Sequence, residues 1–303
     1  MVIKYNVTML AMIPLTGYCN RECDHCYDDS GPSRERKEMD IETAKSIMNQ
    51  AVDLGIKHIQ LTGGGEPTLY SEFKKLAKCG KILKQRGRLG ENKFKILSLV
   101  TNGWFITGNR KKNTGKFRKY VGMGFDKIDV SSSRFHVKQN PAIKNLEVHN
   151  NYRNVVYSLD TSTAIRGMGR ARTVLGIETS ECRGASKINI IMAYPDGYHM
   201  CCFHRNKIGD LDEPLQEVVE RMYNDPFLRA MGIPDFGDEF FPWLQENYKD
   251  MMGEDGLDIS VFDGISCGDV CTTCDRITSD VQYSDILREA SLEYLSQHGI
   301  ILE

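Results

Sequence analysis

Residues 8–26 have the sequence TMLAMIPLTGYCNRECDHC, in which an apolar segment leads directly into three closely spaced cysteines. The segment Thr8–Ile13 is short and apolar and is followed by a proline, a pattern typical of a buried β-strand. The polar loop with Cys19, Cys23 and Cys26 therefore follows the C-terminal end of the first predicted strand.

Short apolar strands alternate with amphipathic helices over roughly the first half of the chain. The predicted strands are 8–13, 57–61, 96–100, 127–130 and 155–159, with a less regular sixth at 173–177. Such alternation predicts an α/β fold with a parallel sheet or a (β/α) barrel. We predict a partial (β/α)6 TIM-like barrel, short or open, followed by a smaller cysteine-rich α+β domain.

Local signals mark where several helices and turns begin. Asp40 is a predicted N-cap, Ser71 can cap the next helix, and Asp212 is predicted to cap a helix with Pro214 in its first turn. Each of these helices has one apolar face: Ile41, Ala44, Ile47, Met48 and Ala51; Phe73, Leu76, Ala77 and Leu83; and Leu215, Val218, Val219 and Met222. Residues 195–197, Pro-Asp-Gly, predict a hairpin turn.

Composition excludes several classes of protein. The net charge is −2, so bulk charge favours neither nucleic acid nor membrane binding. No apolar run approaches the roughly 20 residues of a membrane span, and the N-terminal segment lacks the usual signal-peptide cleavage pattern. We therefore expect a cytoplasmic protein, in which clustered cysteines bind metal more often than they form disulfides.

Charge is unevenly distributed along the chain. Residues 78–119 contain many Lys and Arg but only one acid, Glu91, whereas residues 235–258 contain many acids but only one base, Lys249. These segments form either two solvated faces or, in the case of the first, a basic surface for an acidic peptide or nucleotide.

The spacing Cys19-x3-Cys23-x2-Cys26 is the strongest chemical signal. Three thiolates in one loop can ligate three irons of a cubane and leave the fourth iron open to a ligand. From spacing alone, a zinc site or inert buried thiols are alternatives, although His25 is adjacent to Cys26 and poorly placed to join it on one ion.

Polar or glycine-rich turns follow the second, third and fourth predicted strands. They are Gly63-Gly64-Gly65-Glu66, Thr101-Asn102-Gly103 and Ser131-Ser132-Ser133. In (β/α) barrels the chemistry lies at this end of the strands. Glycines allow the backbone to approach a ligand closely, and carbonyls or the Glu66 carboxylate can accept from an ammonium group.

Together these motifs resemble the radical S-adenosylmethionine (SAM) superfamily. The cysteine spacing is the superfamily signature, and His25 matches the aromatic residue usual before the last cysteine. The resemblance implies that Gly64, Gly65 and Glu66 form the turn that binds the SAM amino group. It further implies roles for three other residues: Asn102 in a recurrent turn, Ser131 near the SAM ribose, and Arg170 at the SAM carboxylate.

The resemblance also implies a mechanism. A [4Fe–4S] cluster on Cys19, Cys23 and Cys26 would bind SAM and, with an electron from a donor such as a flavodoxin or ferredoxin, cleave it. The products would be methionine and a 5′-deoxyadenosyl radical that removes hydrogen from the substrate. The cofactor supplies the difficult chemistry, and the protein positions it and excludes side reactions.

Six further cysteines follow the predicted barrel, whereas Cys79 lies within a predicted helix and is interpreted as a buried structural thiol. The spacing from Cys182 to Cys202, and the helix after it, resemble SPASM or twitch auxiliary-cluster domains. This implies one auxiliary [4Fe–4S] cluster, with a zinc knuckle as the alternative. Its predicted ligands are Cys182, Cys202, Cys271 and Cys274, with Cys201 and Cys267 as competing choices. The predicted domains are 1–175 and 176–303.

Three functions are compatible with these features. The leading hypothesis is a radical SAM enzyme that oxidises or cross-links a peptide or protein side chain. The second is a small-molecule radical SAM dehydrogenase. The third, from another class, is a zinc-binding protein that binds a partner without catalysis. Nucleic acid is not expected as a partner.

Overall fold

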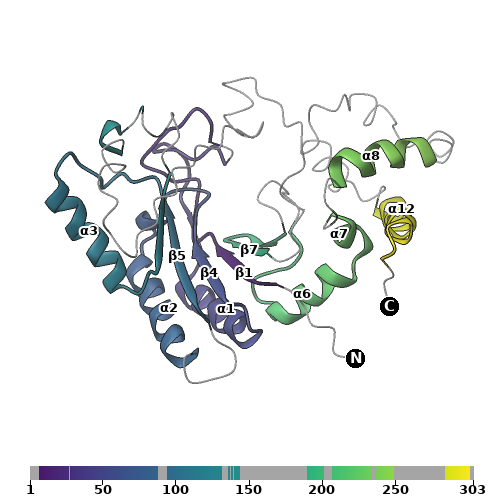
Figure 1. The fold of residues 1–303 in the computed structure, drawn as a ribbon, viewed down its shortest axis with the longest axis horizontal. Helices are drawn as coiled ribbons and strands as arrows, with labels where there is room; N and C mark the ends of the chain where they lie inside the picture. The colour runs from purple at the N-terminus through teal and green to yellow at the C-terminus, as the bar shows by residue number, and fades with distance from the viewer. Residues whose placement is uncertain are drawn as a thin grey trace.

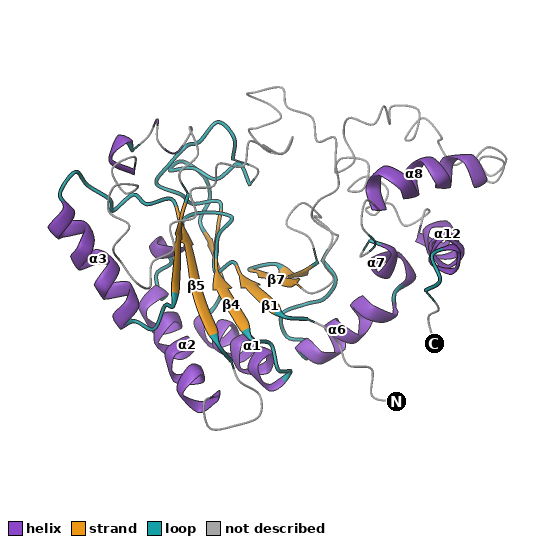
Figure 2. Cartoon of the chain, in the orientation of Figure 1, coloured by secondary structure: helices purple, strands orange, loops and turns teal. Residues whose placement is uncertain are grey.

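The computed structural model describes most of the first half of the chain and several later segments (Figure 2). The described residues are 7–26, 28–87, 94–131, 136, 138, 140–143, 190–200, 207–231, 233, 236–248 and 284–300. None of the helices within these ranges is both long and apolar enough to cross a membrane.

A sheet with the order β6-β5-β4-β1-β7-β8 forms the centre of the described structure. Its strands are β1 (Met9–Met12), β4 (His58–Leu61), β5 (Ile96–Thr101), β6 (Lys127–Val130), β7 (Ile190–Tyr194) and β8 (Gly197–His199). The first five run parallel, and β8 pairs antiparallel with β7. The first four predicted strands are thereby confirmed. Those at 155–159 and 173–177 lie outside the described residues, so closure of a barrel stays a prediction.

Three helices cover one face of the sheet: α1 (Ile41–Asp53), α2 (Phe73–Gly87) and α3 (Arg110–Gly122) (Figure 1). Alternation within each strand sends every second side chain to these helices. The side chains of Ile59, Leu61, Leu97 and Leu99 are completely buried in this core. The predicted apolar faces of α1 and α2 also lie in it, so the local hydrophobic pattern correctly predicted which side of each helix packs.

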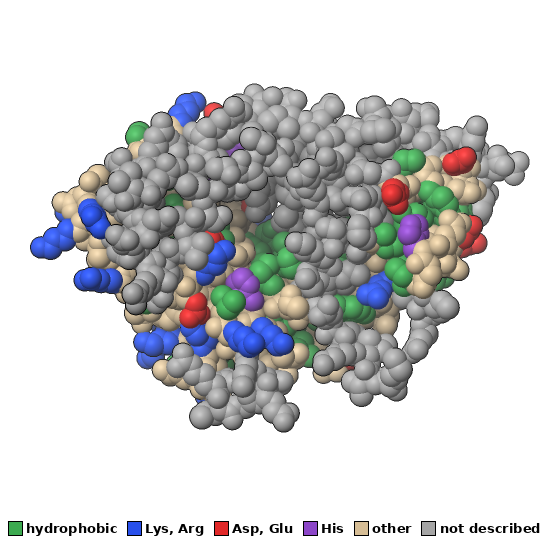
Figure 3. Space-filling model, in the orientation of Figure 1, with side chains coloured by type: hydrophobic (Ala, Val, Ile, Leu, Met, Phe, Trp, Pro, Cys, Tyr) green, Lys and Arg blue, Asp and Glu red, His purple; other side chains and the backbone are tan. Residues whose placement is uncertain are grey.

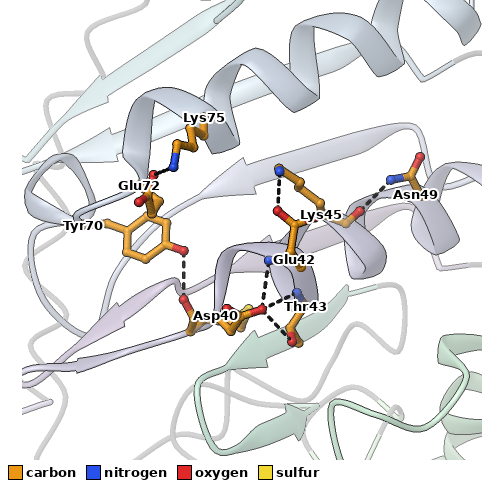
Figure 4. A network of polar contacts seen from close by, with 9 residues as sticks. Asp40, Glu42, Thr43, Lys45, Asn49, Tyr70, Glu72 and Lys75 are labelled. Atoms are coloured by element: carbon orange, nitrogen blue, oxygen red, sulfur yellow. Dashed lines mark hydrogen bonds and ion pairs between the residues drawn. The ribbon is translucent and has the colours of Figure 1, made fainter.

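Asp40 caps α1 as predicted (Figure 4). Its carboxylate accepts hydrogen bonds from the backbone N–H groups of Glu42 and Thr43, at 2.9 and 3.0 Å, and these bonds lower the pKa of the carboxyl. Next to it, the Tyr70 hydroxyl donates to the Met39 carbonyl at 2.8 Å. The start of α1 is therefore held both by its own cap and by the segment that leads into α2.

Ser71 lies two residues before the start of α2 and contacts β3 (Lys37–Glu38). Its backbone N–H and hydroxyl donate to the Glu38 carboxylate at 2.9 and 2.6 Å. Partial burial raises the pKa of Glu38, but the bonds from Ser71 and Arg36 outweigh it and lower that pKa overall. Because β3 pairs with β2 (Leu15–Thr16), Ser71 connects α2 to the strand pair beside the cysteine loop.

The prediction that Asp212 caps the next helix is wrong. In the structure, α6 (Leu215–Asn224) has Pro214 at its N-cap position, with no side-chain capping bond. The Leu215 N–H donates instead to Oε1 of Gln50 on α1, at 2.7 Å. A neighbouring helix thus supplies the acceptor that one of the first N–H groups requires. The predicted buried face of α6 is confirmed.

Helices α6, α7 (Pro226–Ala230), α8 (Phe236–Asn247) and α12 (Ser284–Gln297) lie beyond the β7 side of the sheet (Figure 1). They share a core of aromatic side chains that includes Phe227, Phe240, Phe241, Trp243 and Tyr294. The predicted hairpin turn at 195–197 is confirmed, but its strands extend the central sheet. The predicted boundary near residue 175 lies outside the described residues and stays a prediction.

We expect Phe117→Ala to destabilise the fold by about 3–5 kcal/mol, the usual loss for a buried phenylalanine. Phe117 on α3 is 1% exposed, and its ring lies 5.7 Å from that of Phe105, edge to face. Urea unfolding measures the loss, with Lys111→Ala on the exposed side of α3 as control. Equal stability of the two variants would contradict this assignment of α3 to the core.

Candidate functional site

The three cysteines lie in one closed loop after β1. The two ends of the loop are joined by bonds from the Gly31 N–H to the Gly17 carbonyl, at 2.9 Å, and from the Cys19 N–H to the Gly31 carbonyl, at 3.3 Å. Within it, the Cys26 N–H donates to the Cys23 carbonyl at 3.0 Å. Cys23 is buried, and Cys19 and Cys26 are half-buried. The three predicted ligand residues are therefore held in one closed loop, which follows the short strand β2.

Backbone and side-chain N–H donors point at sulfur atoms of this loop. The Ser30 backbone N–H contacts Sγ of Cys26, and the Asn102 side-chain amide contacts Sγ of Cys19, each at 3.3 Å. Burial raises the pKa of the Cys19 thiol, partly opposed by a bond from the Arg21 backbone. Donors to sulfur favour the thiolate, which is the form that ligates iron. These donors therefore offset part of the effect of burial, and three thiols in one loop match the ligand set of a [4Fe–4S] cluster.

Among the described residues, no group of three His, Cys, Asp or Glu side chains converges closely enough to hold a single metal ion. In a [4Fe–4S] cluster each cysteine binds a different iron. A single-ion site and a [4Fe–4S] cluster therefore require different spacings of the cysteine sulfur atoms.

The glycine turn after β4 lies directly against the cysteine loop. The Gly17 N–H donates to the Gly64 carbonyl at 3.1 Å, and the Glu66 N–H donates to the Tyr18 carbonyl at 3.3 Å. A Cβ at Gly65 would lie 2.3 Å from that Tyr18 oxygen, whereas at Gly64 it would meet the Asp28 side chain at 3.0 Å. Gly65 thus allows two backbones to approach more closely than any side chain permits.

Glu66 connects the glycine turn to the turn after β5. It is 1% exposed, and one carboxylate oxygen accepts from the Thr68 hydroxyl at 2.6 Å and the Thr101 hydroxyl at 2.8 Å. The same oxygen accepts from the Thr68 N–H at 3.2 Å, and the other accepts from the Asn102 N–H at 2.7 Å. Burial raises the pKa of this carboxyl, and the four bonds oppose the rise. The carboxylate is therefore surrounded by donors from the protein itself.

Asn102 brings the turn after β5 to the cysteine loop. Its side-chain amide donates to the Asn20 side chain at 3.0 Å as well as to Cys19. Its side-chain oxygen accepts from the Trp104 N–H at 2.9 Å. Ser131, at the end of β6, lies beside this turn because its N–H donates to the Thr101 carbonyl at 2.8 Å. Four predicted turns and loops thus meet at the C-terminal ends of adjacent strands.

The remaining predicted site residues lie outside the described residues. They are Arg170, Cys182, Cys201, Cys202, Cys267, Cys271 and Cys274. Cys79 lies in α2, as predicted, where it is half-buried and burial raises the pKa of its thiol.

Two residues of the site, Thr68 and Ser30, were not predicted from the sequence, although a threonine two residues after Glu66 is a typical partner of a turn carboxylate. Thr101 was predicted as part of the turn with Asn102, but its bond to Glu66 was not. The rings of His25 and His136 lie 4.8 Å apart, edge to face, which places His136 beside the cysteine loop.

The face of the sheet away from α1, α2 and α3 is polar. On it, His58 Nε2 lies 2.7 Å from the Ser98 hydroxyl, and the Lys127 ammonium lies 2.9 Å from the Asp129 carboxylate. Burial, together with the charge of Lys127, lowers the pKa of His58. Asp129 precedes Ser131 by two residues on the same side of the chain, so this polar face continues from the site into the inner side of the sheet.

We expect Gly65→Ala to prevent the glycine turn from packing on the cysteine loop, because the new Cβ would meet a backbone oxygen that has no side-chain freedom to move away. Iron retained per chain after anaerobic reconstitution should fall to less than half. Gly108→Ala, where a Cβ meets open space, is the matched control. Full iron retention by Gly65→Ala would contradict the observed packing.

The family described as the radical SAM superfamily matches residues 13–165. Over 123 residues the chain is 30% identical to the "Probable GTP 3′,8-cyclase" of Methanothermobacter marburgensis, a match that covers 41% of this chain and 37% of that protein. The chain thus matches little more than a third of that relative's length.

A solved structure shares the fold. BtrN in complex with AdoMet and 2-DOIA superposes with a TM-score of 0.53 at 17% identity, covering 74% of this chain and 87% of that one. The anSMEcpe structure with bound AdoMet gives a TM-score of 0.44 at 13% identity, covering 96% and 93% of the two chains. Because the family match includes half of this chain and contains the cysteine loop and both turns, the chain belongs to the radical SAM superfamily.

Proposed function

We propose that this protein is an enzyme that cleaves SAM reductively and uses the resulting radical to remove hydrogen from a substrate. One observation carries the proposal: the cysteine loop, the glycine turn and the turn after β5 are joined by direct hydrogen bonds at Tyr18, Glu66 and Asn102. When bound on Cys19, Cys23 and Cys26, a [4Fe–4S] cluster supplies the electron that splits SAM into methionine and a 5′-deoxyadenosyl radical.

The residues around this loop have distinct proposed roles. The turn with Gly64 and Gly65 accepts from the SAM ammonium through a backbone carbonyl other than that of Gly64, which already accepts from the Gly17 N–H and the Ser30 hydroxyl. The Glu66 carboxylate likewise already accepts four bonds from the protein. Glu66 is thus a positioning residue. Ser131 lies toward the ribose, and Arg170 binds the SAM carboxylate. All of these groups act before the chemical step, by holding SAM in the orientation that the step requires.

The proposed substrate is a peptide or protein side chain, which is oxidised or cross-linked. The resemblance of the C-terminal cysteines to SPASM or twitch domains supports this class. An auxiliary [4Fe–4S] cluster on Cys182, Cys202, Cys271 and Cys274 would then accept the electron that the substrate radical loses. The proposal places the enzyme in the cytoplasm, where reducing conditions keep its cysteines available for iron.

A small-molecule substrate is the second candidate. It is favoured by the name of the relative from M. marburgensis, which describes a cyclase acting on a nucleotide. The polar face of the sheet, with the Lys127–Asp129 ion pair, is compatible with such a compound. This candidate needs no peptide-binding surface.

Anaerobic reconstitution followed by incubation with SAM and dithionite tests the proposal. We expect 5′-deoxyadenosine and an iron content of about eight per chain, or about four without the auxiliary cluster, since each cubane contains four irons. A colourless protein that holds zinc and forms no 5′-deoxyadenosine would instead support the non-catalytic zinc protein. Faster formation with peptides than with nucleotides would distinguish the two substrate classes.

A further inference from the structure

Helix α3 is strongly basic and lies in the outer layer of the fold (Figure 1). It carries six cationic side chains and no acidic one: Arg110, Lys111, Lys112, Lys116, Arg118 and Lys119. All six are exposed. Within the part of the chain that the structure describes, none of them has a carboxylate within salt-bridge distance. Lys and Arg side chains are also prominent at this end of the space-filling view (Figure 3). The helix therefore presents to solvent positive charge that no carboxylate of the described residues compensates.

An exposed tryptophan adjoins this basic helix. Trp104 is 38% exposed, and the Lys116 ammonium lies 6.0 Å from the centre of its ring. The indole N–H donates to the Thr68 hydroxyl at 2.9 Å, which fixes the orientation of the ring. Lys112 precedes Lys116 by one helical turn and so lies on the same side of α3. Lys112, Lys116 and Trp104 together form what we term the Trp104 surface.

The Trp104 surface is connected to a predicted cluster ligand by two hydrogen bonds. The backbone N–H of Trp104 donates to the Asn102 side-chain oxygen at 2.9 Å, and the Asn102 side-chain amide donates to Sγ of Cys19 at 3.3 Å. Asn102 itself is buried, so the tryptophan is the solvent-exposed end of this path. A molecule seated on Trp104 would lie close to the cysteine loop.

The location of this surface indicates which kind of molecule could bind there. Helix α3 covers the outer face of the sheet, whereas the polar face with Ser98 and Asp129 is on the other side. A substrate must reach the radical and therefore the inner side. An electron donor needs only to approach the cysteine loop from outside. The position of the Trp104 surface thus favours a donor over a substrate.

We propose that the Trp104 surface docks an acidic protein that carries a single reducing electron. This inference rests on the proposed function, because it assigns the source of the electron that SAM cleavage requires. The carrier is oxidised by one electron and the cluster is reduced by one. Opposite charges on the two proteins steer the encounter, and the exposed indole supplies an apolar contact at its centre.

The test compares two charge-reversed variants of the reconstituted holoenzyme. Lys112→Glu/Lys116→Glu alters the Trp104 surface. Lys57→Glu/Lys95→Glu makes the same change in net charge at two exposed lysines that adjoin the N-terminal ends of β4 and β5, the opposite edge of the sheet. Each protein is assayed for SAM cleavage with reduced flavodoxin and, separately, with dithionite. Binding of flavodoxin is measured directly at low and high salt.

We expect Lys112→Glu/Lys116→Glu to raise both the KM and the Kd for flavodoxin about tenfold or more, with loss of most of the salt dependence. Its dithionite-driven cleavage should stay within about twofold of wild type, since small reductants need no docking. The control should change both values less than about threefold, because the six residues of β5 separate its charges from the turn with Trp104. At about 3.3 Å per residue, that strand is longer than a Debye length of about 8–10 Å.

Equal weakening by the two variants, or none by the first, would overturn the proposal. So would a loss of affinity for an acidic substrate peptide with unchanged binding of flavodoxin, which would assign the surface to that peptide. If the wild type forms no 5′-deoxyadenosine with dithionite, the proposed function fails. The binding measurements then still decide whether this surface holds flavodoxin.

Discussion

Cys23→Ala should reduce formation of 5′-deoxyadenosine at least about 100-fold, since changes even to residues behind the metal ligands cost 10–100-fold. Cys23 is the buried member of the three cysteines, 7% exposed, and alanine offers no atom that can bind iron. The iron content should fall by about four per chain, the content of one cubane. Anaerobic iron analysis and product chromatography measure the two effects on the same sample.

Cys79→Ala is the matched control for this variant. Cys79 is also partly buried, but it lies in α2 and belongs to the packing of that helix. We expect its removal to leave iron content and SAM cleavage unchanged. If Cys23→Ala and Cys79→Ala form equal amounts of 5′-deoxyadenosine, the assignment of the cysteine loop as the catalytic centre is incorrect.

Glu66→Ala should destabilise the protein by about 3 kcal/mol or more, because each buried donor left without an acceptor costs about 1–3 kcal/mol. The donors that lose their acceptor are the backbone N–H of Asn102 and groups of Thr68 and Thr101. These bonds hold the turns after β4 and β5 together. The affinity for SAM should therefore fall with the stability, although the Glu66 carboxylate does not contact SAM in our proposal.

Glu66→Gln separates these contributions. The glutamine side-chain oxygen can replace the carboxylate oxygen that accepts from Thr68 and Thr101, but its amide group then faces the Asn102 N–H, which is also a donor. We expect a smaller loss of stability, about 1–3 kcal/mol, because only the Asn102 N–H loses its acceptor. Urea unfolding and equilibrium binding of SAM measure both effects. Unchanged stability in Glu66→Ala would show that the two turns are held by other contacts.

Local patterns in the sequence predicted the parts of the site and the elements that position them. The strands at the first four predicted positions, the Asp40 cap and the buried faces of α1, α2 and α6 are as expected. Each depends on hydrophobic period or on a cap within a few residues, which are properties that a short segment has by itself. The family resemblance was likewise carried by motifs of four to eight residues.

Contacts between distant segments could not be predicted in the same way. The acceptor for the Leu215 N–H is Gln50, 165 residues away, so the local expectation of an Asp212 cap was wrong. Likewise β7 pairs with β1, although the sequence assigned residues 190–194 to a separate domain. Such partners depend on which surfaces meet after folding, and no local pattern specifies them.

The sequence by itself determined that the chain has three thiols in one loop, a glycine turn and polar strand ends, arranged in the order typical of a radical SAM protein. Only the tertiary structure decided how they act together. Parallel pairing of β1, β4 and β5 brings their C-terminal ends to one edge, where Asn102 reaches Cys19 across 83 residues of sequence. The same packing makes Glu66 a buried connection between turns and leaves Trp104 exposed beside a basic helix. Which side chains are buried, and which residues distant in sequence touch, depends on the distances that the folded backbone sets between them.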